Sequence, residues 1–198
     1  MLRYVVLAPM SAITYKSVFP RIKEGRLWLG RGFRHGDAYF VMQDGSTVHF
    51  RNCTWLASVP HRMRDPLPPL HTAAWNLEHH TRLRKWLQER GLPTDAYPRS
   101  DNYDAIEVPF TDAIPSDYDG AMGVPISFLD KWEHPGAYEV VGSFNAHGAA
   151  WVGHGALVPS ADAPCMVNGK QVLWNGPVVA GSPLYKRVVI RRRPETPC

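Results

Sequence analysis

Residues 101–132 are the stretch that most limits how this 198-residue chain can fold. Proline fixes one backbone dihedral angle and glycine opens the left-handed region, so a run that mixes them specifies an ordered path. Residues 116–120 carry turn residues and predict a tight turn. We therefore expect a rigid, acidic, aromatic loop, followed at 126–132 by a short amphipathic run of two helical turns. A structural loop without chemistry explains these residues equally well. The turn-forming, acidic and aromatic residues of its middle are Pro115, Asp117, Tyr118, Asp119, Gly120, Gly123 and Pro125.

The charge is distributed unevenly along the chain, although the net charge is only +4. Residues 1–64 hold ten Lys or Arg against three Asp or Glu, whereas residues 101–144 hold one Lys against nine Asp or Glu. Basic segments can neutralise phosphates, and an acidic centre is repelled by them. Carboxylates near DNA can nevertheless accept from the amino group of cytosine. The pattern is compatible with nucleic acid, and an ordinary solvated basic surface explains it more simply.

The composition excludes several other classes of protein. The three cysteines are odd in number and far apart, which fits neither a disulfide framework nor a zinc site and predicts a reducing, cytoplasmic location. No apolar run approaches the roughly 18 residues that a membrane span needs, so we expect no membrane partner. His71, His79 and His80 are close in sequence but point in different directions on a helix, and we interpret them as surface residues rather than metal ligands.

The first part of the chain has the pattern of an α/β unit. A β-branched run at 2–8 predicts a buried strand, and the spacing of apolar residues predicts a helix over 14–24, which Gly25 ends and Pro20 can kink. A second strand is expected at 26–30. An Asp-Gly turn at 43–46 then predicts a hairpin of 39–42 with 47–50, and a further strand is expected at 53–59.

The rest of the chain predicts one good helix and several strands. Residues 65–70 are rich in proline and predict an extended linker. The helix is expected over 78–90, with a basic wet side and Gly91 after its end. Strands are expected at 138–142 and 188–190, and Asn168-Gly169 predicts a hairpin within 166–174.

The central stretch also resembles a known family. Its residues 102–109, NYDAIEVP, and the run IPSDYDGAMGVPISFLDK at 114–131 are similar to the signature of the EcoRI-type adenine-specific DNA methyltransferases. The resemblance extends to AITYK at 12–16 and LWLG at 27–30, and to LYKRVVIRR at 184–192. One departure is visible at 73–77, where the family's Trp-aromatic-Thr-Asn-Leu run keeps only its last two residues in place.

The resemblance implies methyl transfer from S-adenosylmethionine to an adenine amino group in double-stranded DNA, by an Asn/Asp-Pro-Pro-aromatic tetrapeptide and a glycine-rich cofactor turn. Neither motif is in this sequence; the nearest tetrapeptide, DPLP at 65–68, lacks the second proline and the aromatic residue. The family's motifs lie upstream of the matched region, so the chain resembles its C-terminal half only. We therefore expect no catalytic residue here and an uncovered strand at 2–8. Either a separate chain carries the catalytic half, or the chain is a poorly stable truncated product.

The predicted fold is mixed α+β: the C-terminal part of a Rossmann-like methyltransferase sheet at 1–64, a linker with a basic helix at 65–100, and a β-rich target-recognition region at 101–198. The alternatives are a non-catalytic DNA-binding or interaction protein and a gene fragment without a role. Candidates to line the completed site are Thr14, Tyr15 and Lys16. Candidates to contact DNA are Asn102, Tyr103, Asp117, Tyr118, Asp119, Lys131, Lys186, Arg187, Arg191 and Arg192.

Overall fold

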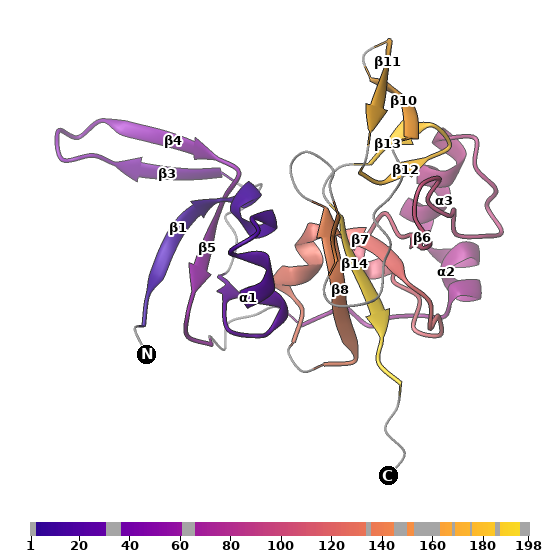
Figure 1. Ribbon diagram of the computed structural model, residues 1–198, viewed down its shortest axis with the longest axis horizontal. Coiled ribbons are helices and arrows are strands. Elements are labelled where there is room, and N and C mark those ends of the chain that lie inside the picture. Colours follow the sequence, from indigo (N-terminus) through magenta and orange to yellow (C-terminus); the bar gives the residue numbers. More distant parts are fainter. Residues whose placement is uncertain are drawn as a thin grey trace. The chain divides into compact units, whose positions relative to one another are not determined.

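The chain is mixed α+β, as predicted, with short helices and several small sheets (Figure 1). The computed structural model describes residues 3–30, 37–60, 66–133, 136–144, 150–152, 163–167, 169–174, 176–184 and 187–194. The chain divides into two compact units. Unit 1 comprises residues 1–65 and 129–131, and unit 2 comprises residues 66–128 and 132–198.

Unit 1 is built on a three-stranded sheet with the order β1-β5-β2. Both outer strands pair antiparallel with β5, so β1 and β2 run parallel to each other with β5 between them. The strands predicted at 2–8, 26–30 and 53–59 are confirmed by these three, but the burial predicted for the first is wrong, because the residues of β1 are exposed or half-buried. The elements of unit 1 are β1 (Val5–Pro9), η1 (Met10–Thr14), α1 (Phe19–Lys23), β2 (Trp28–Leu29), β3 (Asp37–Val41), β4 (Thr47–Arg51) and β5 (Cys53–Ala57).

The helix expected over 14–24 is shorter than predicted. The chain first makes the 3-10 helix η1, and α1 begins only at Phe19. Pro20 lies in the first turn of α1, where its missing N–H group is not needed, so it starts the helix instead of kinking it. Gly25 follows with a φ of 65°, as expected for a residue that ends a helix.

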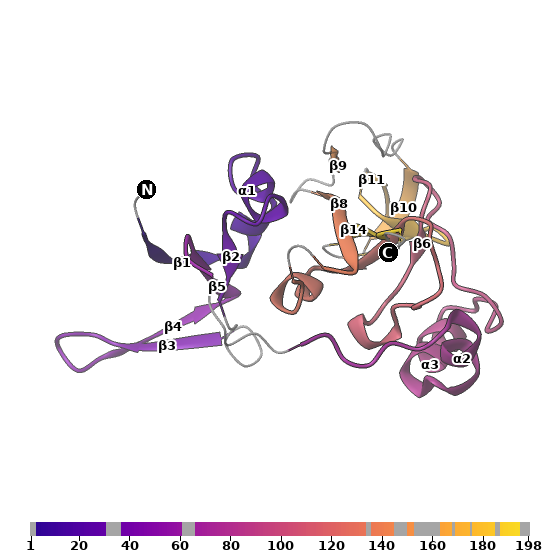
Figure 2. The same cartoon turned by 90° about the horizontal axis from the view of Figure 1, so that it is seen from below.

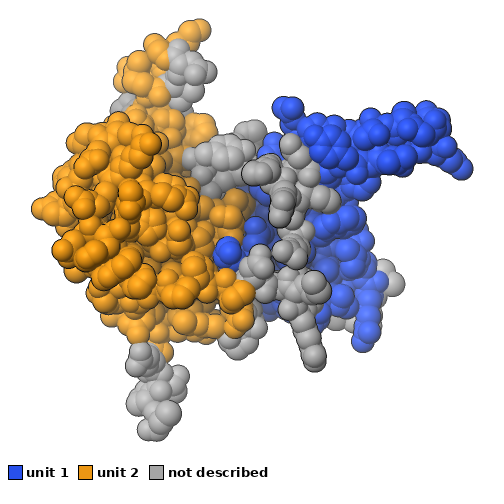
Figure 3. Space-filling view, turned by 180° about the vertical axis from the view of Figure 1, so that it is seen from behind, with its two compact units in different colours: residues 1–65, 129–131 blue, residues 66–128, 132–198 orange. Residues whose placement is uncertain are grey.

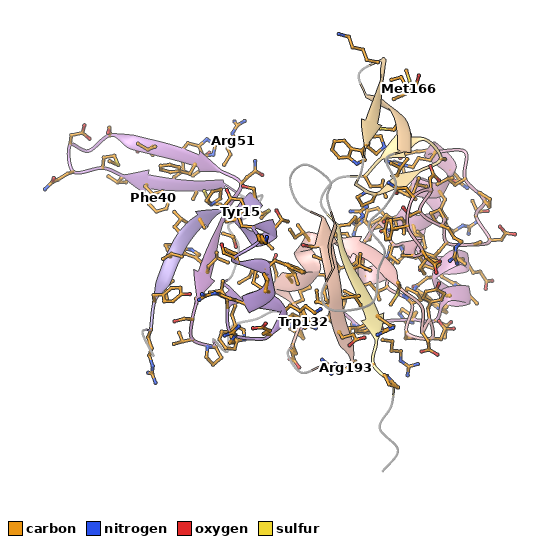
Figure 4. The ribbon with its side chains drawn as sticks, viewed as in Figure 1. Tyr15, Phe40, Arg51, Trp132, Met166 and Arg193 are labelled. Atoms are coloured by element: carbon orange, nitrogen blue, oxygen red, sulfur yellow. The ribbon has the colours of Figure 1, made fainter. Side chains whose placement is uncertain are left out.

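The predicted hairpin of β3 and β4 is confirmed and projects from the rest of unit 1 (Figure 1). Its turn depends on Gly45, whose φ is 81°, and on Asp44, whose carboxylate accepts a hydrogen bond of 2.9 Å from the Ser46 backbone N–H group. Phe40 and Arg51 mark its two strands (Figure 4).

Unit 2 is built on a five-stranded sheet with the order β6-β7-β14-β8-β9. Its elements are α2 (Ala73–His79), α3 (Thr81–Glu89), β6 (Ile106–Glu107), η3 (Thr111–Ala113), β7 (Met122–Pro125), η4 (Ile126–Asp130, whose last two residues are counted with unit 1), β8 (Tyr138–Phe144), β9 (Ala150–Val152), β10 (Ala163–Val167), β11 (Lys170–Trp174), β12 (Val178–Val179), β13 (Ser182–Pro183) and β14 (Arg187–Arg192). The predicted strands at 138–142 and 188–190 are confirmed, and so is the hairpin of β10 and β11; Asn168 of its turn lies outside the described residues.

The helix predicted over 78–90 is wrong in its first part. Two helices, α2 and α3, lie side by side (Figure 2), and the chain turns between them at His80, where ψ is 94°. Each has its own N-cap, because Thr72 accepts from the Trp75 N–H group and the imidazole of His80 accepts from the Leu83 N–H group. The single residue between them, His80, is neither Gly nor Pro, so no local signal in the sequence predicts the break.

The core of unit 2 lies on β14, the strand that pairs with both β7 and β8. Val188 and Ile190 are completely buried, and Val189 is 2% exposed. The two units are coloured separately in Figure 3.

Candidate functional site

The stretch that carries the family resemblance is part of the core of unit 2 and not a loop laid over it. Residues 106–107 form β6, which pairs in parallel with β7, and β7 pairs with the central strand β14. Val108, Ile114, Met122, Val124 and Phe128 are completely buried. The expected rigid acidic loop is therefore wrong as a description of the whole stretch, because its apolar residues are buried and two short strands, β6 and β7, form within it.

A buried ionic cluster lies where β6, β7 and β14 meet. The Glu107 side chain is fully buried, and its Oε2 atom accepts a hydrogen bond of 3.2 Å from Nε of Arg187 on β14. The Tyr103 hydroxyl donates to the other carboxylate oxygen. Burial raises the pKa of Glu107 to about 7, although Arg187 and Tyr103 both act to lower it.

Gly123 of β7 leaves the room that this cluster needs. A Cβ atom at that position would meet the Tyr103 hydroxyl and lie 2.7 Å from both carboxylate oxygens of Glu107. Tyr103 and Arg187 were predicted to contact DNA. The structure places both side chains in the interior, in a cluster that holds three strands together.

Two further residues at the start of the stretch bind the segment that contains β12 and β13. The Asp101 carboxylate accepts from the backbone N–H groups of Ala180 and Gly181, at 3.2 and 2.9 Å. The side chain of Asn102, another predicted DNA contact, donates a hydrogen bond of 2.7 Å to the Gly176 carbonyl. Asp101 thus holds the turn between β12 and β13, and Asn102 binds the chain just before β12.

Two acidic residues in the middle of the stretch, Asp112 and Asp117, contact residues at the starts of α3 and α2. The Asp117 carboxylate accepts from the Ala73 N–H group at 2.7 Å and so satisfies a free amide in the first turn of α2. Asp112 lies 3.4 Å from Nε2 of His80 and 3.3 Å from the Arg82 guanidinium. Since Nδ1 of His80 accepts from the Leu83 N–H group, a neutral ring carries its proton on Nε2, the nitrogen that faces Asp112.

Two of the predicted cationic contacts are partly exposed and paired. On β14, Arg191 donates to the Glu139 carboxylate at 2.6 Å from one terminal nitrogen and 2.9 Å from Nε. Arg192 lies 3.5 Å from the carboxylate of Asp119, whose side chain is 85% exposed. Such surface pairs are weak, so their cations can exchange a carboxylate for a phosphate oxygen.

The other predicted residues are dispersed. Tyr118 is half-buried, and Lys131 belongs to unit 1. Lys186 lies outside the described residues. In unit 1, Thr14 is buried and its hydroxyl donates to the Ser11 carbonyl, whereas the side chains of Tyr15 and Lys16 are exposed.

Sequence reasoning missed several residues that the structure brings together, notably Glu107, Asp101, His80 and the buried Asn76. Asn76 is fully buried and its side-chain amide donates to the carbonyl groups of His71 and Ala113, both at 3.3 Å. A signal existed for Glu107, because an acidic residue between Ile106 and Val108 in a strand pattern is a candidate for a buried, paired charge. No local signal marked the partners of the others.

Neither a metal-binding group nor a membrane-spanning helix is found in the part of the chain that the structure describes. No group of three or more His, Cys, Asp or Glu side chains there is placed to hold a metal ion. None of the helices found there is long and apolar enough to cross a bilayer.

Comparison with known proteins identifies the family. The chain matches the family described as adenine-specific methyltransferase EcoRI over residues 2–193. It is 32% identical over 154 residues to the type II methyltransferase M.EcoRI of Escherichia coli, which covers 70% of this chain and 42% of that protein. It is 27% identical over 147 residues to the type II methyltransferase M.MpnI of Mycoplasma pneumoniae, covering 70% of this chain and 43% of that protein.

The chain thus spans less than half the length of these two curated relatives. No solved structure matches it. The family match nevertheless includes β1 at one end and β14 at the other, and therefore both units. This chain belongs to the EcoRI family of adenine-specific methyltransferases.

Proposed function

We propose that this chain is the C-terminal portion of an adenine-specific (N6) DNA methyltransferase of the EcoRI type, within a restriction–modification system of the cytoplasm. In this proposal it contributes recognition of the DNA target, and a separate chain supplies the cofactor and catalytic motifs. The observation that carries the proposal is the family match over residues 2–193 in a chain that covers only 42% and 43% of two relatives.

The exposure of strand β1 supports the proposal that a separate catalytic half packs against this chain. Val5 is 59% exposed and Val6 is 44% exposed, and neighbouring residues of a strand point to opposite faces. Antiparallel sheets can leave one face to water, but a strand with apolar residues at successive positions exposes apolar surface on both faces unless something covers it. β1 also lies at an edge of the described three-stranded sheet, where unpaired backbone groups can accept another strand. We infer that a strand of the catalytic half pairs with β1.

The described residues after β1 do not fit S-adenosylmethionine, the methyl donor that the family implies. A cofactor site of this kind uses a glycine-rich turn directly after a strand. Here β1 ends at Pro9 and continues into η1, and the Thr14 hydroxyl is already bonded to the Ser11 carbonyl. We therefore derive no step of methyl transfer from this chain. Tyr15 and Lys16 remain candidates to line the site once the catalytic half is present.

The DNA contact that we propose uses the exposed pairs of β14. Arg191 and Arg192 are the last two residues of β14, and they pair with Glu139 and Asp119 respectively. A DNA phosphate would replace Asp119 beside Arg192 at little cost, because a solvent-exposed pair contributes only about 0–1 kcal/mol. Arg187 takes no part, since its guanidinium is engaged with Glu107 in the interior.

The first experiment measures binding of the purified chain to a fluorescent duplex by anisotropy at low salt. Arg192→Ala should weaken binding and reduce the slope of log K against log salt by about 1. Asp119→Asn should strengthen binding, because it removes the competing carboxylate. Arg99→Ala is the matched control, an exposed arginine paired with Asp104 that has no part in the proposal. A wild-type chain that fails to bind duplex DNA at low salt would exclude the recognition role.

The second experiment tests whether a separate chain can supply the cofactor and catalytic motifs. The chain is mixed with M.EcoRI cut back to the part upstream of the segment that this chain matches, and transfer of a labelled methyl group from S-adenosylmethionine to duplex DNA is measured. Activity is expected only in the mixture. Methylation by this chain alone would overturn the proposal, and an inactive mixture of two DNA-binding halves would favour a non-catalytic DNA-binding protein.

A further inference from the structure

We propose that three stacked rings on the surface of unit 2, those of His71, Trp75 and His79, form a platform on which an unpaired nucleobase of the bound DNA stacks. This inference deepens the proposed function and rests on it, because it names a contact made within the recognition role. It concerns an exposed part of α2 that the other candidate contacts do not use.

The three rings lie almost parallel and in sequence order along one side of α2. The ring centroids of His71 and Trp75 are 3.7 Å apart with an angle of 21° between the planes. Those of Trp75 and His79 are 4.9 Å apart with an angle of 18°. The four-residue spacing places Trp75 and His79 on the same face of α2, whereas His71 precedes the N-cap residue Thr72 and reaches the stack from the chain that enters the helix.

The stack is held rigidly at its base. The His71 carbonyl accepts from the Ser116 N–H group at 2.9 Å and from the buried amide of Asn76. Thr72 caps the helix on the N–H group of Trp75, and Asp117 satisfies that of Ala73. A ring system fixed in this way loses little conformational freedom when a ligand stacks on it, which favours binding.

Packing does not explain why the stack lies at the surface. Trp75 is 39% exposed, and His71 and His79 are also exposed. Both faces of the indole are already covered by imidazoles, so the surfaces open to a ligand are the outer faces of the two histidines. A flat heteroaromatic ring can extend such a stack at either end, and every nucleobase has the required π-face.

The surroundings of His79 suit a nucleotide better than an isolated aromatic ring. The Arg84 guanidinium, on α3, donates to the Glu78 carbonyl at 2.8 Å, which places an exposed cation beside the last turn of α2. It can bind the phosphate attached to a base stacked on His79. The Glu78 carboxylate, 3.8 Å from Nδ1 of His79, acts against this and limits the gain. A base within an intact duplex is already stacked on its neighbours, so only an unpaired one can use the platform.

The test compares two fluorescent duplexes of the same sequence, one perfect and one with a single extra, unpaired adenine. Wild-type chain is expected to bind the bulged duplex about tenfold more tightly, within the range known for stacking of one base on an aromatic residue. Trp75→Leu keeps an apolar, helix-forming residue but removes the ring, and should abolish the preference. Trp75→Phe should retain most of it. Neither change should alter binding to the perfect duplex or the far-ultraviolet circular dichroism.

A second readout follows the base itself. With 2-aminopurine as the unpaired base, wild-type and Trp75→Phe chains should quench its fluorescence, and Trp75→Leu should not. An unchanged preference and unchanged quenching in Trp75→Leu would show that the stack only stiffens α2, even if DNA binding is confirmed. Failure to bind either duplex would refute the recognition role and this inference with it.

Discussion

The carboxyl group of Glu107 should make the stability of the protein depend on pH, in a direction that glutamine at this position can test. Burial raises its pKa from the usual 4.5 to about 7, ahead of the opposing effects of Arg187 and Tyr103. The folded chain therefore keeps a proton on Glu107 where the unfolded chain has released it. The resulting stabilisation is complete below pH 4.5 and is lost as the pH rises to about 7. It amounts to about 3 kcal/mol, because one pH unit in this window corresponds to about 1.4 kcal/mol.

Glu107→Gln mimics the protonated side chain and removes this loss. The Tyr103 hydroxyl can turn to accept from the carboxamide, and Arg187 can donate to the carboxamide oxygen, so the buried groups remain satisfied. We expect the free energy of unfolding of the variant to stay flat between about pH 5 and about pH 8, where that of the wild type falls. Above pH 7 the variant should therefore be the more stable of the two. Buried ion pairs often contribute no more than an uncharged replacement of similar shape, which agrees with this direction.

The assay is urea unfolding followed by tryptophan fluorescence across this pH range, with the midpoint compared at a constant slope m. Glu139→Gln is the matched control, because Glu139 pairs with Arg191 on the surface of the same sheet; its effect should stay below about 1 kcal/mol at every pH. Arg187→Met should act in the opposite sense and destabilise most at high pH, where a buried carboxylate loses its cation. A Glu107→Gln variant several kcal/mol less stable than the wild type at high pH would refute the reasoning and show that the ion pair stabilises the fold.

Three smaller changes test other contacts of unit 2 by the same urea assay. Asp101→Ala should cost about 1–2 kcal/mol, because it leaves the N–H groups of Ala180 and Gly181 without their acceptor, and amide exchange should accelerate at both. Ala180→Gly should stabilise by about 0.5–1 kcal/mol, since Ala180 has a φ of 47° that glycine adopts without strain; a lower midpoint would contradict this. His80→Ala should cost about 1 kcal/mol by removing the N-cap of α3, and His80→Asn should restore part of it.

Local patterns in the sequence were enough to predict the elements that local interactions determine. The hairpin of β3 and β4 follows from Asp44 and Gly45, which fix its turn without help from the rest of the chain. The apolar runs at 188–190 and 138–142 predict buried strands, and in the structure they lie in β14 and β8, where most of their side chains are buried. The start of α3 could not be predicted in this way, since it depends on an imidazole that acts as an N-cap, a role more often filled by Ser, Thr, Asp or Asn.

The candidate site could be located from the sequence but its contacts could not. Glu107 and Arg187 are 80 residues apart, Asp101 and Gly181 are also 80 apart, and Asp117 and Ala73 are 44 apart. Nothing in a short window distinguishes a carboxylate that will meet a distant amide or guanidinium from one that will face water. This is why the residues of 101–132, taken from the sequence alone, predict a rigid acidic loop.

The same contacts change what the acidic centre means for DNA. Residues 101–144, with one lysine against nine acidic residues, should repel a phosphate backbone if their carboxylates face solvent. In the structure Glu107 is buried against Arg187, and Asp101 and Asp117 are bound to backbone N–H groups. Each of these carboxylates has a positive charge or an amide dipole beside it, which reduces the field that it projects. The repulsion that remains at the end of β14 comes from exposed residues such as Asp119, and that is why Asp119→Asn is the substitution expected to strengthen DNA binding.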